Sequence, residues 1–307
     1  MTRVIITGGT GLIGRRLVPY LARQGYEVFV LTRNAGRHAD TAPQVPGLRF
    51  VQWDSLTPQG WEHLINADSV VINLAGENVA NWRWTLTHKR IVLRSRVDAT
   101  RAVVQAIAQA QHKPKALLQA SAVGYYGDRG QMAVGEITTA GDGWRAEVCK
   151  IWEAESAPVE SYGVRRVLLR IGVVLERGGG ALPALALGAR FMAGQLGDGQ
   201  QWVPWVHNAD VTGALYHILH DESISGAVNI VAPYPAMNRD LLRAIGAAWR
   251  WPTFIPVPAF ALRLALGEMA STVLDSQRIY PPLLLESGYQ FLFPQIGDAA
   301  RDLLRSR

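Results

Sequence analysis

Short apolar runs alternate with longer amphipathic segments along the first part of the chain. Most of these runs are unbroken rather than alternating with polar residues, and they lie at 4–7, 27–32, 49–53, 69–74, 116–120 and 167–171. Unbroken apolar strands separated by helices are typical of a parallel sheet that is covered on both faces. The pattern therefore predicts an α/β fold of the Rossmann type, a doubly wound parallel sheet with ligands at the carboxyl ends of its strands.

The composition and periodicity of the chain change after Gly178-Gly179-Gly180, where Pro and Trp become more frequent and the periodic segments become shorter. We predict a dinucleotide-binding Rossmann domain at 1–175 and a smaller C-terminal α/β region at 176–307, which contacts the substrate or forms a lid. Segments at about 205–235 are expected to return to the first domain, because a helical pattern there is followed by another strand-like run.

The first apolar run ends in the glycine-spaced turn Gly8-Gly9-Thr10-Gly11-Leu12-Ile13-Gly14. In such a turn the first glycine permits tight backbone geometry, the second lets the backbone approach a pyrophosphate, and the third lets a helix pack on the strand. The N-terminus of the following helix favours an anion. Because the motif follows a strand and precedes a helix, it predicts a dinucleotide phosphate site.

The second apolar run ends at Arg33, where a protein that binds NAD usually places an acidic residue for the ribose hydroxyls. A guanidinium pairs with a 2′-phosphate, whereas a carboxylate would repel it. The sequence therefore favours NADP(H). Arg37 is either a second phosphate contact or a solvated loop residue.

Composition narrows the remaining possibilities for this chain of 307 residues, of which 49% are hydrophobic and 18% charged. Cys149 is its single cysteine, which excludes an internal disulfide and gives no metal cluster, so no metal is expected and the cytoplasm is the expected location. We expect no membrane span and no secretory signal. The formal charge of +6 includes a basic cluster at 88–96, which we interpret as a solvated helix face or a contact to an anionic ligand rather than a nucleic-acid site. A monomer or homodimer is expected.

Motifs along nearly the whole chain resemble an extended short-chain dehydrogenase/reductase. Its atypical epimerase family of SDR39U1-like proteins, which has a small C-terminal domain, is the most similar branch. The similarity rests on the glycine turn, Asn73-Leu74-Ala75-Gly76, Gly124-Tyr125-Tyr126-Gly127, Cys149-Lys150-Ile151-Trp152-Glu153, Arg170-Ile171-Gly172-Val173-Val174-Leu175 and Gln277-Arg278-Ile279-Tyr280-Pro281. Together with the turn, the resemblance implies NADP(H) contacts at Gly8, Thr10, Gly11, Leu12, Ile13, Gly14, Arg33, Asp54, Leu74, Ala75, Gly76 and Glu77.

The chain lacks the Tyr and Lys pair that ordinary members of this superfamily use for proton transfer. Counted back from Arg170, the Tyr position falls near Arg145 and the Lys position near Cys149. Ser121 matches the serine that hydrogen-bonds a substrate oxygen in the superfamily. We predict a catalytic set in which a tyrosine supplies the missing acid and Lys150 or Arg145 lowers its pKa. Its members are Ser121, Tyr125, Tyr126 and Lys150.

Two functions of different classes follow from these residues. The first is an NADP-dependent oxidoreductase or epimerase that moves a hydride between the nicotinamide and a carbonyl or carbinol carbon of a small, possibly sugar-like substrate. The second is a non-catalytic NADPH-binding sensor or scaffold, which the missing Tyr and Lys pair favours. Trp82 and Trp84 either stack on a flat or sugar-like ligand or pack within a lid.

Overall fold

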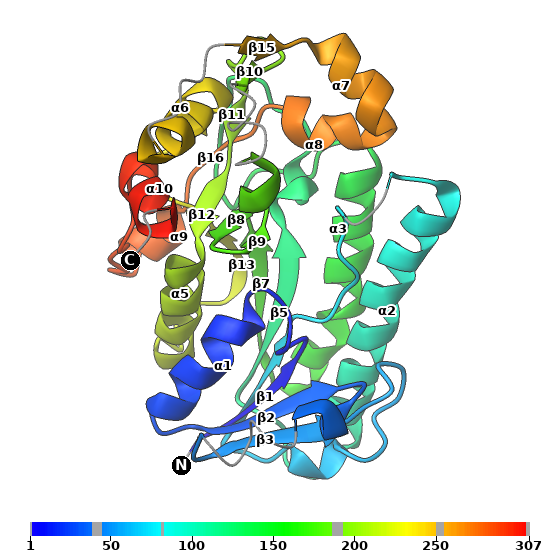
Figure 1. The fold of residues 1–307 in the computed structure, drawn as a ribbon. Coiled ribbons are helices and arrows are strands. Elements are labelled where there is room, and N and C mark those ends of the chain that lie inside the picture. The colour runs from blue at the N-terminus through cyan, green and yellow to red at the C-terminus, as the bar shows by residue number, and fades with distance from the viewer. Residues whose placement is uncertain (1, 39–44, 81–82, 186–192, 250–254, 305–307) are drawn as a thin grey trace.

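A parallel sheet of seven strands forms the centre of the molecule (Figure 1), in the order β13-β7-β5-β4-β1-β2-β3. The computed structural model describes residues 2–38, 45–80, 83–185, 193–249 and 255–304. The strands of this sheet are β1 (Arg3–Thr7), β2 (Glu27–Thr32), β3 (Leu48–Gln52), β4 (Ser69–Asn73), β5 (Ala116–Ala122), β7 (Arg165–Ile171) and β13 (Gly226–Ile230). The chain starts in the middle of the sheet, builds outwards to β3 and then crosses to β4, which is the doubly wound order that the sequence predicted. Each of the six apolar runs forms a strand of this sheet.

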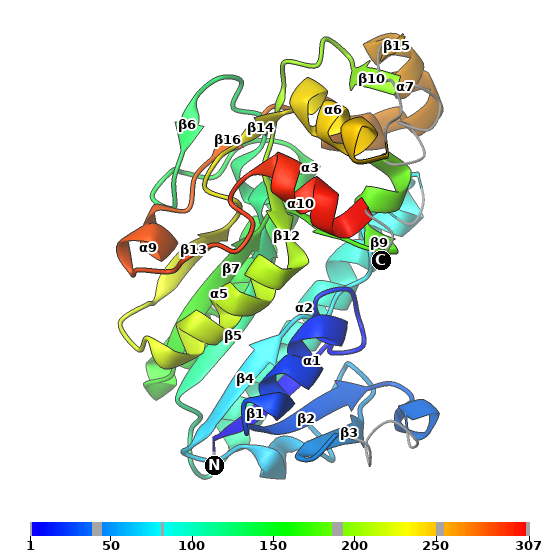
Figure 2. The same ribbon diagram turned by 60° about the vertical axis from the view of Figure 1, so that its left-hand side comes forward.

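Helices cover both faces of the sheet. Figure 2 brings α1 (Gly14–Arg23) and α5 (Asn208–His220) to the front of one face, while α2 (Leu86–Gln109) and α3 (Trp144–Glu155) pack on the other. Alternate residues of β1 point to opposite faces, so Val4 and Ile6 join the core beneath α1 and α5, and Ile5 joins the core beneath α2. Burial on both faces explains why the strands are apolar without interruption. None of the helices in the described ranges combines the length and the apolar character that a membrane span needs.

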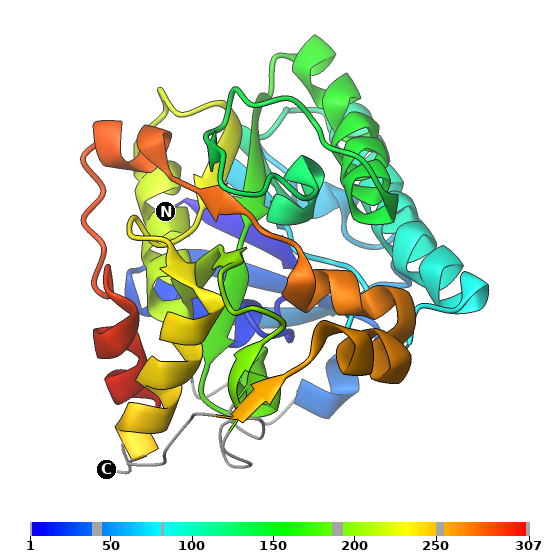
Figure 3. The same cartoon turned by 90° about the horizontal axis from the view of Figure 1, so that it is seen from above.

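Most of the chain after β13 lies across the carboxyl ends of the strands, as the view from above shows (Figure 3). Its helices are α6 (Asn238–Trp249), α7 (Ala259–Leu266), α8 (Ser271–Leu274), α9 (Pro282–Glu286) and α10 (Ile296–Leu304). A separate small core joins α6 to α10 through Leu241, Ile245 and Leu303. Before it reaches these helices, the chain passes through α5 and β13, which belong to the layers of the central sheet.

Short strands and turns connect this region to the sheet. The short strands are β6 (Ala133–Val134), β8 (Val173–Glu176), β9 (Gly179–Gly180), β10 (Ala193–Leu196), β11 (Trp202–Val203), β12 (Trp205–His207), β14 (Ala236–Met237), β15 (Ile255–Val257) and β16 (Arg278–Ile279). The 3-10 helices are η1 (Ala35–His38), η3 (Glu62–Leu64), η4 (Val123–Tyr126), η5 (Ala157–Tyr162) and η6 (Gly267–Ala270). Parallel pairing of β12 with β8 and of β16 with β6 holds the C-terminal region over the carboxyl ends of β5 and β7. A site at this edge therefore has walls from both parts of the chain.

Candidate functional site

The glycine-spaced turn borders a cleft of about 420 Å³ at the carboxyl ends of β1, β2 and β4. Most residues of the predicted cofactor set line this cleft, namely Gly8, Thr10, Gly11, Arg33, Asp54, Leu74, Ala75, Gly76 and Glu77. Leu12 instead lines a neighbouring groove, and Gly14 is the first residue of α1. Helix α1 begins without a side-chain cap, and although the N–H groups of Arg15 and Arg16 donate to the carbonyl oxygens of Gly11 and Ile13, those of Ile13 and Gly14 have no partner among the described residues and remain available to an anion.

Steric contacts explain two of the glycines in the turn. Gly8 has φ of +67°, and a Cβ there would lie 2.6 Å from the carbonyl group of Leu74. A Cβ on Gly14 would lie 2.3 Å from the carbonyl oxygen of Gly9. Side chains at these positions would push the turn away from β4 and away from α1, so the shape of the turn depends on both glycines.

Polar side chains shape the rim of the cleft. Thr7 Oγ1 donates to Asn73 Oδ1 at 2.5 Å, and the backbone N–H of Ala75 donates to Thr7 Oγ1 at 3.2 Å, which holds the segment after β4 in place. Arg33 is exposed and lines the cleft from the end of β2. Slight burial opposes ionisation of Asp54, but the N–H groups of the following turn donate to its carboxylate and lower its pKa. The rim thus presents an accessible guanidinium and an ionised carboxylate.

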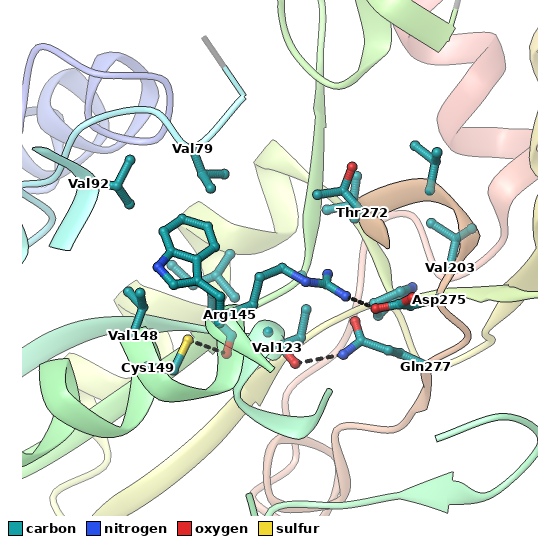
Figure 4. Close-up of a pocket in the computed structure, with 18 of the residues that line it drawn as sticks. Val79, Val92, Val123, Arg145, Val148, Cys149, Val203, Thr272, Asp275 and Gln277 are labelled. Carbon is teal, nitrogen blue, oxygen red and sulfur yellow. Dashed lines mark hydrogen bonds and ion pairs between the residues drawn. The ribbon is translucent and has the colours of Figure 1, made fainter. Parts of the chain in front are cut away.

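A second cavity, of about 260 Å³, lies at the carboxyl ends of β5 and β7 (Figure 4). Its walls come from α2, α3, η4 and the segment 272–277 of the C-terminal region. Most of its side chains are apolar, including Val79, Val92, Val123, Val148, Ile171, Val173, Val203, Trp144, Trp152 and Trp202. Such walls exclude water and strengthen any electrostatic contact made inside.

Arg145 and Asp275 form an ion pair on the wall of this cavity (Figure 4). Arg145 extends from α3, and Asp275 comes from the chain that follows α8, so the pair joins the two parts of the protein. Burial raises the pKa of Asp275, and the neighbouring guanidinium opposes this change. Beside them, Gln277 donates from Nε2 to the carbonyl oxygens of Val123 at 3.0 Å and Gly127 at 2.7 Å.

Cys149 and Arg96 also line the cavity. The thiol of Cys149 donates to the carbonyl oxygen of Ala122 at 3.6 Å, and burial raises its pKa to about 11. Arg96 lies over the ring of Trp152 at 4.8 Å, and its Nη1 donates to the carbonyl oxygen of Glu77 at 2.9 Å. Because Glu77 borders the first cleft, Arg96 connects the two hollows. Burial lowers the pKa of its guanidinium without removing the charge at neutral pH.

The structure brings together Arg145 and Cys149, the two residues that occupy the usual Tyr and Lys positions. Sequence reasoning missed Arg96 and Asp275 as site residues. A weak signal existed for Arg96, which belongs to the basic cluster at 88–96, whereas Asp275 stands in a segment with no motif of its own.

Two members of the predicted catalytic set lie behind the cavity, in a buried polar network. Ser121 is 3% exposed and donates to Glu153 Oε1 at 2.6 Å. Glu153 in turn forms a bidentate ion pair with Arg170, with both hydrogen bonds at 2.9 Å. Tyr126 is fully buried, donates to Asn229 Oδ1 at 2.7 Å and accepts from Arg170 Nη1 at 3.0 Å. Burial raises the pKa of this phenol. Both hydroxyl groups therefore point into the protein and have partners there, and the catalytic roles of Ser121 and Tyr126 stay predictions.

The other two members of that set, Tyr125 and Lys150, interact electrostatically, but each has a different direct partner. The ring of Tyr125 lies beneath the guanidinium of Arg170, with 3.5 Å between the ring centroid and Cζ. Lys150 is half exposed and pairs with Glu147 at 2.5 Å, which raises its pKa. Neither side chain borders the cavity, and their catalytic role stays a prediction.

The predicted tryptophan pair is described in part, since Trp82 lies outside the described residues. Trp84 packs against Trp144 with ring centroids 4.6 Å apart, and its Nε1 donates to the carbonyl oxygen of Val79 at 2.9 Å. It lines a groove of about 560 Å³ that shares Arg145 and Asp275 with the cavity. Trp84 therefore packs against Trp144 and also lies beside the cavity.

Comparison with known proteins yields matches over the whole chain. Residues 4–230 match the model of the NAD dependent epimerase/dehydratase family, and residues 257–303 match a domain of unknown function (DUF1731). The epimerase family protein YfhF of Bacillus subtilis is 35% identical over 306 residues, with 99% of this chain and 98% of the relative covered. The mouse epimerase family protein SDR39U1 is 35% identical over 307 residues, with 98% and 99% covered.

Solved structures give the same result. The crystal structure of human epimerase family protein SDR39U1 with NADPH superposes with a TM-score of 0.87 at 35% identity and covers 98% of this chain and 99% of that one. A nucleoside-diphosphate sugar epimerase from Corynebacterium glutamicum superposes with a TM-score of 0.77 at 35% identity. The superposition includes 99% of this chain and 58% of that longer chain. The protein therefore belongs to the NAD dependent epimerase/dehydratase family and carries the additional C-terminal DUF1731 domain.

Proposed function

We propose that this protein binds NADP(H) along the carboxyl edge of its sheet and moves a hydride between the nicotinamide and a carbonyl or carbinol carbon of a small molecule. One observation carries the proposal: the cleft at the glycine turn and the apolar cavity lie next to each other, joined by Arg96. A dinucleotide lies across this edge of a doubly wound sheet, so its two halves would meet the two hollows in turn. The NADPH in the human SDR39U1 structure supports the choice of cofactor.

The cleft at the glycine turn suits the adenosine and phosphate half of the cofactor. Arg33 at its rim would pair with the 2′-phosphate, and the N-terminus of α1 would face the pyrophosphate. The remaining predicted contacts, from Asp54 and from the segment 74–77, form the walls beside the ribose and base. The lack of a Cβ at Gly8 and Gly14 fits this assignment, because each would otherwise collide with backbone.

The apolar cavity suits the reacting end. The nicotinamide supplies or accepts the hydride when it is bound. Arg96 would polarise the substrate oxygen, and Arg145, at the position of the usual tyrosine, adds a second positive charge in surroundings that exclude water. A guanidinium does not release a proton at neutral pH. Asp275, which contacts Arg145 and whose pKa burial raises, is therefore the group we assign to proton transfer.

The second candidate is an NADPH-binding protein without turnover. It is favoured by a specific observation: Arg145 and Cys149 replace the usual acid and lysine, while Ser121 and Tyr126 hold other partners. Binding of NADPH alone does not separate the two candidates, because both use the same cleft.

Transfer of deuterium separates them. NADPH labelled at both C4 positions is incubated with the protein and a pool of small metabolites, and mass spectrometry follows the label. Label in a metabolite, dependent on the protein, establishes a reductase and identifies its substrate by mass. If no label moves while NADPH is bound, in a pool that is also tested with NADP⁺, the hydride-transfer proposal is contradicted and the non-catalytic function is favoured.

The cofactor assignment has its own test in Arg33→Asp. We expect this change to weaken NADPH binding relative to NADH by about tenfold or more, which corresponds to ~1.4 kcal/mol for a lost charge-assisted contact. Arg243→Asp, at an exposed arginine of α6, is the matched control and should leave both affinities unchanged. Equal losses for NADPH and NADH in Arg33→Asp would contradict the 2′-phosphate contact.

A further inference from the structure

The polar side chains on the wall of the apolar cavity are mostly committed to the protein itself. The side-chain amide of Gln277 donates to two backbone carbonyl oxygens, and the Cys149 thiol donates to a third. Thr272 Oγ1 donates to the carbonyl oxygen of Met269 at 2.7 Å, and Trp202 Nε1 donates to Gln131 Oε1 at 2.7 Å. A sugar, whose hydroxyl groups each need a partner, would find few here.

Arg145 differs from these residues. Its side chain lies along the cavity in Figure 4 and is 19% exposed. Both hydrogen bonds that it makes within the described ranges come from Nη2, one to Asp275 and one to the carbonyl oxygen of Ser271 at 3.4 Å. Nε and Nη1 make none there, so the guanidinium keeps donors for an oxygen of a ligand.

The charges on the wall do not cancel. Arg96 and Arg145 contribute two positive charges and Asp275 one negative charge, while the Cys149 thiol stays neutral at physiological pH. Both hydrogen bonds of Arg96 within the described ranges are to backbone carbonyls, of Glu77 and Val92, rather than to a carboxylate. The Glu77 carboxylate attracts Arg96 from the neighbouring cleft, but among the side chains that line the cavity two guanidinium groups face a single carboxylate, so the wall favours a ligand with one negative charge.

The size of the cavity points the same way. About 260 Å³ lies just below the range of about 300–1,000 Å³ that small-molecule pockets usually have. This space suits a compact molecule. The apolar walls require that the rest of the molecule be mainly hydrocarbon.

We propose that the substrate is a small, otherwise apolar oxo or hydroxy acid, and that Arg145 binds its single carboxylate. This inference rests on the proposed hydride transfer, whose reacting oxygen would then meet Arg96 and Asp275 while the carboxylate accepts from Nε and Nη1 of Arg145. Arg145 thereby becomes the residue that determines specificity for acids over neutral carbonyl compounds.

Matched pairs of ligands test this proposal on the NADPH-loaded protein. The probes are 4-oxopentanoate, 6-oxoheptanoate and 8-oxononanoate, each compared with its methyl ester, which keeps the shape and removes the charge. Their affinities are measured by titration calorimetry and by saturation-transfer NMR. We expect at least one acid to bind more tightly than its ester by about tenfold or more, the effect of a charge-assisted hydrogen bond in an apolar site.

Two variants change this preference in opposite directions. Arg145→Met should abolish it, and Asp275→Asn, which removes the competing carboxylate, should increase it. Arg301→Met, at an exposed residue of α10, is the control and should leave it unchanged. Because Asp275→Asn predicts a gain, the proposal stays testable if Arg145→Met fails to fold.

The proposal is overturned if esters bind as tightly as acids, if the preference for acids survives in Arg145→Met, or if none of the acids binds to the NADPH-loaded protein. Its failure is separate from failure of the proposed function. Acids that bind with the expected preference but receive no deuterium would contradict hydride transfer alone. Deuterium transfer to the esters as efficient as to the acids would contradict the role of Arg145 alone.

Discussion

Removal of Arg170 should destabilise the protein far more than removal of an ordinary surface arginine. The side chains of Arg170 and Glu153 are 6% and 9% exposed, and two hydrogen bonds of 2.9 Å join them. In Arg170→Met, the Glu153 carboxylate would remain buried with the Ser121 hydroxyl as its only remaining side-chain donor among those described. An uncompensated buried charge of this kind costs about 3–5 kcal/mol, out of a total stability of about 5–15 kcal/mol.

A second substitution separates the cost of the unpaired charge from the cost of lost packing. In the double variant Arg170→Met, Glu153→Leu both charges are absent, and we expect the free energy of unfolding to recover to within ~2 kcal/mol of the original protein. Arg101→Met is the control, because it breaks a similarly short ion pair to Glu155 whose arginine is 57% exposed, and it should cost far less stability than Arg170→Met.

The assay is urea unfolding followed by circular dichroism, with NADPH binding as a check that each variant is folded. Equal losses of unfolding free energy in the single and double variants would show that packing, rather than the unpaired carboxylate, determines the cost. A loss of less than about 1 kcal/mol in Arg170→Met would refute the burial argument altogether.

Two further predictions concern titration. Because burial raises the pKa of Cys149 to about 11, alkylation by iodoacetamide should still accelerate with pH above the ordinary thiol value of 9.0, and a plateau of the rate near that value would contradict this. Burial lowers the pKa of His207 from 6.5, an effect that Asp302 partly opposes, so the neutral imidazole stabilises the fold above that pH and the stability is lost as pH falls through the folded value. Urea midpoints measured at about pH 7.5 and about pH 5.5 should therefore differ more in the original protein than in His207→Asn, and an equal difference would exclude His207 as the cause.

Local pattern was sufficient for the elements around the cofactor cleft. The apolar runs became strands because unbroken hydrophobicity suits a sheet buried on both faces, whatever the distant parts of the chain do. Gly8 and Gly14 could be interpreted from spacing alone, since a backbone turn between a strand and its next helix is a short-range problem. Arg145 and Cys149 were placed at the missing acid and lysine positions by counting along the chain.

The catalytic side chains could not be assigned this way. Ser121 stands at the end of β5 as predicted, but successive side chains of a strand point to opposite faces, and the packing of α3 turned this one towards Glu153. Asp275 reaches Arg145 across 130 positions of sequence, by way of a C-terminal segment whose placement depends on its pairing with the rest of the molecule.

The sequence by itself thus determined the sheet, the glycine turn after β1 and the preference for NADP(H), because each depends on a few neighbouring residues and their periodicity. Only the tertiary structure decided which charged groups face the apolar cavity and which lie behind it with hydrogen-bond partners in the protein. That choice follows from where long-range packing leaves a polar group buried and what partner it then finds, and this information is not contained in any local stretch of the chain.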